Sequence, residues 1–161
     1  MIKLTKDNIL TLYKIMVDNT GGTIGIRDTS LLESALNAPF QTFGDEELYP
    51  SIIEKASRLC YGLIKNHPFI DGNKRIGVYA MLVFLESNNL NLNFSDEEII
   101  NIALKTADST YSYEDILGIL YNKSWDLLSF FLYKFINNFT KNTFIIYYFR
   151  YIFTMFSFHY F

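Results

Sequence analysis

The sequence predicts an all-α protein built as a bundle of short amphipathic helices. Apolar residues recur at three- and four-residue spacing through most of residues 1–123, which gives each helix one apolar face. Several of these runs follow a serine with an acidic residue three positions later, a spacing typical of helix N-termini. No part of residues 1–123 is rich in strand-forming patterns, so we expect at most one small hairpin.

The first two helices and the turn between them can be placed from the N-terminus onward. The first helix carries on one face Ile9, Leu12, Tyr13 and Met16. It ends in the segment 19–26, whose three glycines permit positive φ angles and predict a turn or small hairpin. A second helix opens at Ser30, which has capping-box spacing with Glu33, and Pro39 ends it.

The third predicted helix is the central one, because its apolar stripe is the longest. Ser51 and Glu54 form its capping box, and the stripe comprises Ile52, Ile53, Ala56, Leu59, Cys60, Leu63 and Ile64. Pro68 disfavours the helical conformation at His67, so the helix should end there. A fourth helix begins near Asn73 and turns inward Ile76, Ala80, Met81, Phe84 and Leu85.

Two further helices complete the predicted bundle. Ser95 and Glu98 have capping-box spacing and open a fifth helix. The last helix runs from about Ser112 to Tyr121 with its inward face formed by Ile116, Leu117 and Leu120.

Composition and charge exclude several classes of protein. The chain of 161 residues has a net charge of −3, whereas general nucleic-acid binders are usually basic, so we expect no direct nucleic-acid binding. Cys60 is the single cysteine, which excludes an internal disulfide framework and fits a reducing compartment. The N-terminal residues lack the apolar run of a signal peptide. We therefore expect a cytoplasmic protein with one folded domain.

Residues 124–161 differ in composition from the rest of the chain. They contain 16 of the 28 aromatic residues and carry a net charge of +2, against −5 for residues 1–123. We therefore place a boundary near Lys123, with a folded domain over 1–123 and an aromatic-rich apolar tail over 124–161.

Three interpretations of this tail are open. Its apolar stretch, 144–161, has a length that is marginal for a membrane span, and Arg150 and His159 interrupt it. A second interpretation is an extra helix that covers an apolar patch of the domain. The third, which we favour, is a segment read out of frame, because AT-rich DNA gives this bias towards Phe, Tyr, Ile, Asn and Lys.

The segment 67–75, with the sequence His-Pro-Phe-Ile-Asp-Gly-Asn-Lys-Arg, carries groups suited to chemistry on phosphate. It reaches a predicted helix N-terminus, where free backbone N–H groups and the helix dipole favour anions. Lys74 and Arg75 lie in the first turn of that helix, where cations oppose the dipole, and such a conflict often marks function. His67 is of the residue type that takes a proton near neutral pH. Asp71 is a hard oxygen ligand suited to Mg²⁺ held with nucleotide phosphates.

This segment resembles the signature of the Fic/Doc family, in which histidine, phenylalanine, an acid, asparagine and arginine occur in this order and spacing. Lys74 makes it similar to the Doc branch, since Fic adenylyltransferases usually have glycine at that position. The resemblance includes the flanking segments 25–36, 42–50 and 83–85 and covers about residues 3–121. It implies a Fic-like helical bundle with a small β-hairpin flap and a catalytic domain over 1–123.

The resemblance also implies a role for each residue of the motif. His67 would be the general base for a target Ser, Thr or Tyr hydroxyl. Asp71 would bind Mg²⁺, and Phe69 would anchor the loop in the core. The phosphates of ATP would be held by Gly72, Asn73, Lys74 and Arg75. The flap that aligns the target chain by strand-like pairing would contain Gly25, Ile26 and Arg27.

Two departures from the family pattern bear on activity and control. Fic adenylyltransferases often carry a second arginine three residues after the first, where this chain has Val78. Family members with built-in inhibition carry a Ser/Thr-x-x-x-Glu motif followed by Gly or Asn. Segments 29–33 and 110–114 have that spacing, but Ser34 and Asp115 follow them. We therefore expect no internal inhibitor and, as in the Doc branch, restraint by a separate antitoxin.

The resemblance implies a toxin that transfers phosphate from ATP to a hydroxyl of a cellular protein, in the translation machinery by analogy with Doc. The leading alternative is transfer of AMP, in which a different phosphorus faces the attacking oxygen. A side chain as large as Lys74, where Fic adenylyltransferases usually have glycine, would crowd the nucleotide. It would favour the orientation opposite to that of AMP transfer. The other alternative is an inert domain that binds a nucleotide or partner, and the intact set of motif residues argues against it.

Overall fold

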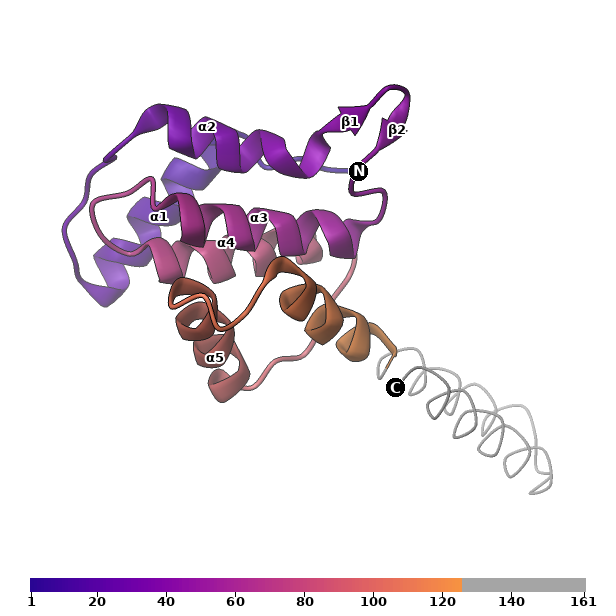
Figure 1. Ribbon diagram of the computed structural model, residues 1–161. Coiled ribbons are helices and arrows are strands. Elements are labelled where there is room, and N and C mark those ends of the chain that lie inside the picture. The colour runs from indigo at the N-terminus through magenta and orange to yellow at the C-terminus, as the bar shows by residue number, and fades with distance from the viewer. Residues whose placement is uncertain (126–161) are drawn as a thin grey trace, which may run out of the picture. The chain divides into compact units, whose positions relative to one another are not determined.

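The computed structural model describes residues 1–125, and within them Met1–Lys123 form one compact unit (Figure 1). The named helices are α1 (Lys6–Thr20), α2 (Thr29–Asn37), the 3₁₀-helix η1 (Ala38–Phe40), α3 (Ile52–Asn66), α4 (Asn73–Ser87) and α5 (Asp96–Ala107). Residues 113–125 are also helical. No helix among the described residues has the length and apolarity that a membrane crossing requires. The three interpretations of the tail fall almost wholly outside these residues and stay predictions.

The predicted all-α class with one small hairpin is confirmed, but the hairpin lies at another place than expected. Strands β1 (Thr42–Phe43) and β2 (Glu46–Glu47) pair antiparallel around Gly44, whose φ of 61° suits a tight turn. The segment 21–25 contains no strand. Its end instead pairs with the loop that follows α3, through a bridge between Ile26 and Phe69. The segment 21–25 is therefore an irregular connection, in which Gly21 and Gly22 have positive φ angles, and not a hairpin.

Hydrogen-bonded caps fix where most of the helices begin. The predicted capping boxes at Ser51 and Ser95 are both present. The predicted box at Ser30 is wrong, because Asp28 caps α2 two residues earlier. The Asp28 carboxylate accepts hydrogen bonds from the backbone N–H groups of Ser30 and Leu31, at 2.8 and 3.1 Å. The Ser30 hydroxyl also donates to this carboxylate and holds the pKa of Asp28 below its usual value.

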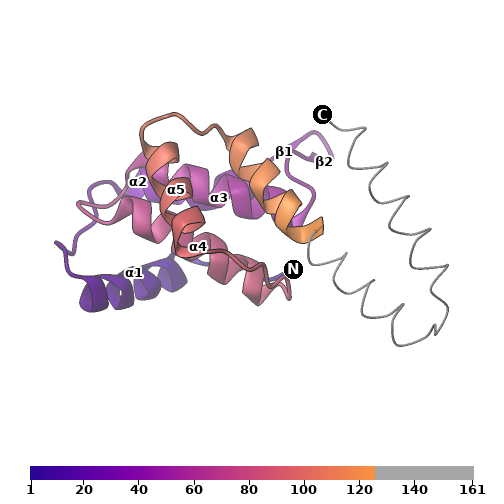
Figure 2. The same cartoon turned by 90° about the horizontal axis from the view of Figure 1, so that it is seen from below.

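The central position predicted for the third helix is correct, since α3 contacts α2, α4 and α5 (Figures 1 and 2). Gly77 of α4 allows α3 and α4 to approach closely, since a Cβ added there would lie 3.2 Å from the carbonyl oxygen of Cys60 on α3. The apolar stripes of α3 and α4 form the core, and their buried members include Ala56, Cys60, Leu63, Ile76, Ala80, Met81 and Phe84. Burial raises the pKa of the Cys60 thiol, so this residue stays an uncharged part of the core.

A buried lysine ties the hairpin to α3. The Lys55 side chain is fully buried, and its ammonium group forms an ion pair of 2.8 Å with Glu47 of β2. It also donates to the carbonyl oxygen of Tyr49. A buried charge is tolerated only when it is paired and hydrogen-bonded, so these contacts fix the segment that leads from β2 into α3.

Replacing Phe84 with alanine tests the position of the core. The Phe84 side chain is 1% exposed on α4, and Phe→Ala in a packed core costs about 3–5 kcal/mol in the free energy of unfolding. The matched control, Tyr79→Ala on the exposed side of the same helix, should cost less than about 1 kcal/mol. Urea unfolding measures both, and equal losses would place the core elsewhere.

Candidate active site

The loop 67–72 joins α3 to α4 and holds the ends of both helices together. His67 caps α3 in the left-handed conformation, with φ 53° and ψ 51°, and Gly72 caps the start of α4 with φ 80°. Phe69 lies fully buried between them, and its ring stacks on that of Tyr13 from α1 at a centroid distance of 4.0 Å. The buried ring fixes the loop, while the His67 side chain stays exposed.

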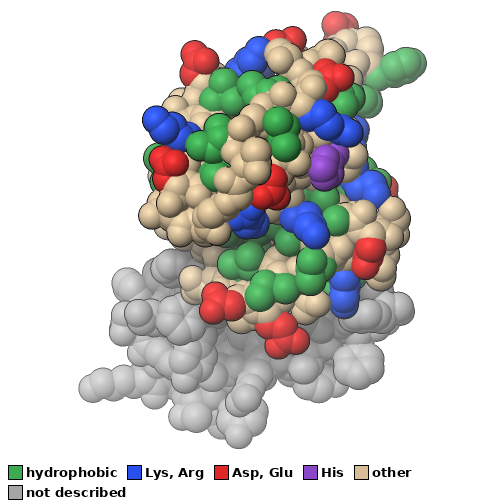
Figure 3. All heavy atoms as spheres, turned by 90° about the vertical axis from the view of Figure 1, so that its left-hand side faces the viewer, with side chains coloured by type: hydrophobic (Ala, Val, Ile, Leu, Met, Phe, Trp, Pro, Cys, Tyr) green, Lys and Arg blue, Asp and Glu red, His purple; other side chains and the backbone are tan. Residues whose placement is uncertain are grey.

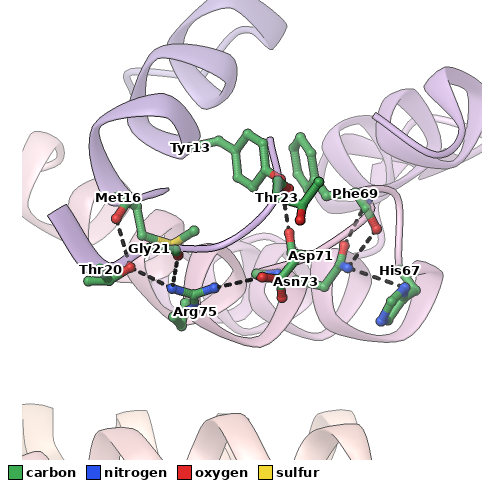
Figure 4. A network of polar contacts seen from close by, with 11 residues as sticks. Tyr13, Met16, Thr20, Gly21, Thr23, His67, Phe69, Asp71, Asn73 and Arg75 are labelled. Carbon is green, nitrogen blue, oxygen red and sulfur yellow. Dashed lines mark hydrogen bonds and ion pairs between the residues drawn. The ribbon is translucent and has the colours of Figure 1, made fainter. Parts of the chain in front are cut away.

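Asn73, the first residue of α4, holds this loop in its folded-back shape. Its side-chain oxygen accepts from the Phe69 N–H at 2.8 Å, and its side-chain nitrogen donates to the Phe69 carbonyl at 2.8 Å (Figure 4). The same nitrogen lies 3.2 Å from Nδ1 of His67. The Asn73 side chain is buried and committed to these contacts. A phosphate contact from this residue would therefore come from its backbone N–H.

The first turn of α4 has backbone donors without a hydrogen-bond partner. Gly72 supplies no side-chain cap, and in the described residues no hydrogen bond reaches the backbone N–H groups of Asn73, Lys74 and Arg75. Unpaired N–H groups at a helix N-terminus attract anions. The exposed Lys74 adds a positive charge to the same turn. Val78 is buried, at 2% exposure, so the position of the missing second arginine faces the core.

Arg75 and Asp71 form the polar end of the site. The Arg75 guanidinium lies 3.3 Å from the Asp71 carboxylate, and it donates to the Thr20 hydroxyl and, at 2.8 Å, to the Gly21 carbonyl at the end of α1. Gly22 makes this approach possible, because a Cβ there would lie 2.5 Å from an Asp71 oxygen. Figure 4 shows His67 on one side of Asn73 and Asp71, and Arg75 with Thr20 on the other side.

The segment expected as the flap lies along this loop. Gly25 accepts from the Ile70 N–H at 2.9 Å, and the Arg27 N–H donates to the Pro68 carbonyl at 2.7 Å. The Arg27 guanidinium also donates to the Asn66 carbonyl at the end of α3. Neighbouring residues of an extended segment point their N–H and C=O groups to opposite sides. Those of Ile26 therefore face away from the loop, and no hydrogen bond reaches them within residues 1–125.

The structure brings together around one short loop the motif residues 67–75 and the segment 25–27 that was expected as the flap. Figure 3 shows a histidine exposed on one face of the molecule, with Lys and Arg side chains near it. The sequence did not predict the role of the Tyr13 hydroxyl, which contacts the carbonyl oxygens of Asp71 and Thr23 at 3.0 and 3.1 Å. The contact of Thr20 with Arg75 was not predicted either. Tyr13 reads in the sequence as an ordinary apolar position of α1, and nothing in its spacing signals the contact.

The residues present fit a magnesium ion that arrives with a nucleotide. Among residues 1–125 no group of three His, Cys, Asp or Glu side chains is arranged to hold a metal ion. Mg²⁺ is usually bound through one or two carboxylates together with substrate phosphates. The half-exposed Asp71 carboxylate beside the free N–H groups of α4 suits that mode.

These features define a class of protein in which an exposed imidazole and an anion-attracting helix N-terminus share one loop of a helical bundle. A model of the Fic/DOC family matches residues 3–85. The chain therefore belongs to the Fic/DOC family. It is also 35% identical, over 89 residues, to Toxin Doc from Mycolicibacterium smegmatis. That match spans 55% of this chain and 66% of the relative. The predicted membership, including the likeness to Doc, is confirmed.

Removing the Tyr13 hydroxyl tests its support of the loop. Tyr13→Phe keeps the ring stacked on Phe69 but removes the donor to the Asp71 carbonyl, and we expect a loss of about 1 kcal/mol in the free energy of unfolding. Tyr79→Phe on the exposed side of α4 is the control and should change little. Backbone hydrogen exchange at residues 69–72 should also speed up in Tyr13→Phe. Unchanged exchange there would show that the hydroxyl does not hold the loop.

Proposed function

We propose that this protein is a Doc-like toxin that transfers the γ-phosphate of ATP to a Ser, Thr or Tyr hydroxyl of a cellular protein, in the translation machinery. The observation that carries the proposal is the loop 67–72, which places an exposed imidazole beside the free N–H groups of α4. The name of the relative, Toxin Doc, supports the toxin activity.

The first turn of α4 is the place for the triphosphate. The N–H groups of residues 73–75 and the positive end of the helix dipole favour negative charge there. Lys74 and Arg75 add two cations, and Arg75 clamps the terminal phosphate once a phosphate oxygen replaces its present partners. Mg²⁺, held by Asp71 and the phosphates, would supply charge neutralisation. Phosphoryl transfer depends mainly on such positioning and charge stabilisation.

His67 supplies the proton acceptor. As the target hydroxyl oxygen attacks the γ-phosphorus, its O–H bond breaks and the proton passes to an imidazole nitrogen of His67. The bond between the γ-phosphorus and the bridging oxygen breaks, and ADP leaves with those electrons. The attachment of the loop through Phe69 and Asn73 keeps the loop that carries His67 at a fixed place relative to α4.

The free edge at Ile26 is the place where the target chain would align. Its N–H and C=O groups are available for strand-like pairing, and Gly25 and Arg27 hold the opposite edge against the loop. The exposed side chains of Ile24, Ile26 and Ile70 offer apolar contacts to the same segment. The target hydroxyl would in this way reach the His67 side of the loop.

We further propose that an antitoxin in trans restrains the protein and that residues 1–123 carry the activity in the cytoplasm, where ATP and the translation machinery are found. The contacts of Glu33, the glutamate of the segment 29–33 that has the spacing of the inhibitory motif, support control by a separate protein. Glu33 forms an ion pair of 2.8 Å with Lys6, whereas Arg75 pairs with Asp71. The compact unit Met1–Lys123 contains every residue of the site.

Incubation with labelled ATP tests the function. With cell lysate as the source of target, label from the γ-phosphate should enter protein and label from the α-phosphate should not. His67→Ala should lower the rate about 100- to 10,000-fold because the base is lost, whereas the control His159→Ala should leave it unchanged. Incorporation from the α-phosphate would show AMP transfer, and absence of both labels in the native protein would indicate a binding module.

Gly22→Ala tests the polar end of the site. The added Cβ would meet Asp71 at 2.5 Å and Arg75 at 3.0 Å, and φ is +124°, so the carboxylate and guanidinium must move. We expect transfer to fall at least about 10-fold, equivalent to about 1.4 kcal/mol of transition-state stabilisation. Gly21→Ala is a matched control, since it also has positive φ but its Cβ meets nothing within 4 Å. Equal rates of transfer in Gly22→Ala and Gly21→Ala would contradict the proposed role of Asp71 and Arg75.

A further inference from the structure

The amide of Asn73 has only one orientation that satisfies the buried loop. The Phe69 N–H requires an acceptor, and the side-chain oxygen of Asn73 lies 2.8 Å from it. The Phe69 carbonyl requires a donor, and the side-chain nitrogen lies 2.8 Å from it. Rotating the amide by 180° would set donor against donor and acceptor against acceptor in the buried loop, where unpaired polar groups are costly.

This orientation determines which proton the His67 ring carries. The Asn73 nitrogen bears two hydrogens and cannot accept. One hydrogen is donated to Phe69, and the other faces Nδ1 of His67 at 3.2 Å (Figure 4). Nδ1 must therefore offer its lone pair. In a neutral imidazole only one nitrogen carries hydrogen, so the hydrogen lies on Nε2, which no side chain or backbone group of residues 1–125 contacts through a hydrogen bond.

We infer that Asn73 is a positioning residue that holds the ligand-free protein in the Nε2–H tautomer of His67. The inference rests on the proposed function, because it concerns the nitrogen that accepts the target proton. Nε2 then carries hydrogen and is a donor, so it cannot take a proton from a hydroxyl in this state. Asn73 thus keeps the base inactive until the contact with Nδ1 is released.

Release has a defined proton balance. When the Asn73 contact breaks, Nδ1 takes one proton from water and Nε2 gives one proton to water, so the ring stays neutral and its lone pair moves to Nε2. The target hydroxyl can then transfer its proton to Nε2 while its oxygen attacks phosphorus. Ligand-free protein is therefore inactive as a base, and binding at the site must separate Asn73 from the ring.

The test is a long-range ¹H–¹⁵N correlation spectrum of the imidazole, recorded on the full-length ligand-free protein at a pH where the ring is neutral. His159→Gln in the background leaves His67 as the single histidine. We expect one tautomer, with hydrogen on Nε2, and not the averaged shifts of a free imidazole. Asn73→Asp in the same background replaces the donor by a carboxylate oxygen and should move the hydrogen to Nδ1. Asn122→Asp, at an exposed position of the last helix, should change nothing.

Hydrogen on Nδ1, or averaged shifts, in the protein with native Asn73 would overturn the inference. The same holds if Asn73→Asp folds, as shown by an unchanged circular dichroism spectrum, and still has hydrogen on Nε2. If Asn73→Asp does not fold, the spectrum with native Asn73 decides alone. The measurement uses neither nucleotide nor target, so its result is independent of whether γ-phosphate, AMP or nothing is transferred.

Discussion

The paired hydrogen bonds between the Asn73 side chain and the backbone of Phe69 are the constraint on which the site depends. They close the loop between α3 and α4 and leave the His67 side chain at its edge. Buried hydrogen bonds of this kind are costly to break because each partner would be left without water. The stacked ring and hydroxyl of Tyr13 attach the same loop to α1. Three helices therefore determine where one imidazole lies.

The charges of the site are arranged for a ligand and not for the stability of α4. Two cations in the first turn oppose the dipole of the helix. Arg75 is partly compensated by Asp71 and by oxygens at the end of α1. Both members of the ion pair are partly exposed, and such pairs contribute little to stability. A triphosphate with its magnesium ion can thus replace these contacts at small cost, and Asp71 is then free to bind the metal.

The sequence was sufficient where local rules decide the structure. The apolar stripes of α3 and α4, the caps at Ser51 and Ser95 and the end of α3 before Pro68 all follow from spacing and backbone preference. The position of the hairpin did not follow, because glycines at 21–25 permit a turn but do not require one. Their pairing with the loop after α3 depends on residues about 40 positions away.

Long-range contacts also explain what was missed inside the site. Tyr13 contacts Asp71 across 58 positions of sequence, and its spacing on α1 indicates only an apolar face. Asn73 was expected to hold phosphate, and the fold commits its side chain to Phe69 and His67, so that only its backbone N–H remains for that contact. Motif spacing predicted which residues lie close together, whereas the fold determines which of their hydrogen-bonding atoms remain available to a ligand.

The most direct test of the central claim is a structure of the protein with magnesium and a non-hydrolysable ATP analogue. We predict that the triphosphate lies on the first turn of α4, with Asp71 on the metal, Arg75 on the terminal phosphate and the γ-phosphorus facing His67. A triphosphate bound away from α4, or one whose α-phosphorus faces His67 with the γ-phosphate pointing away, would contradict it.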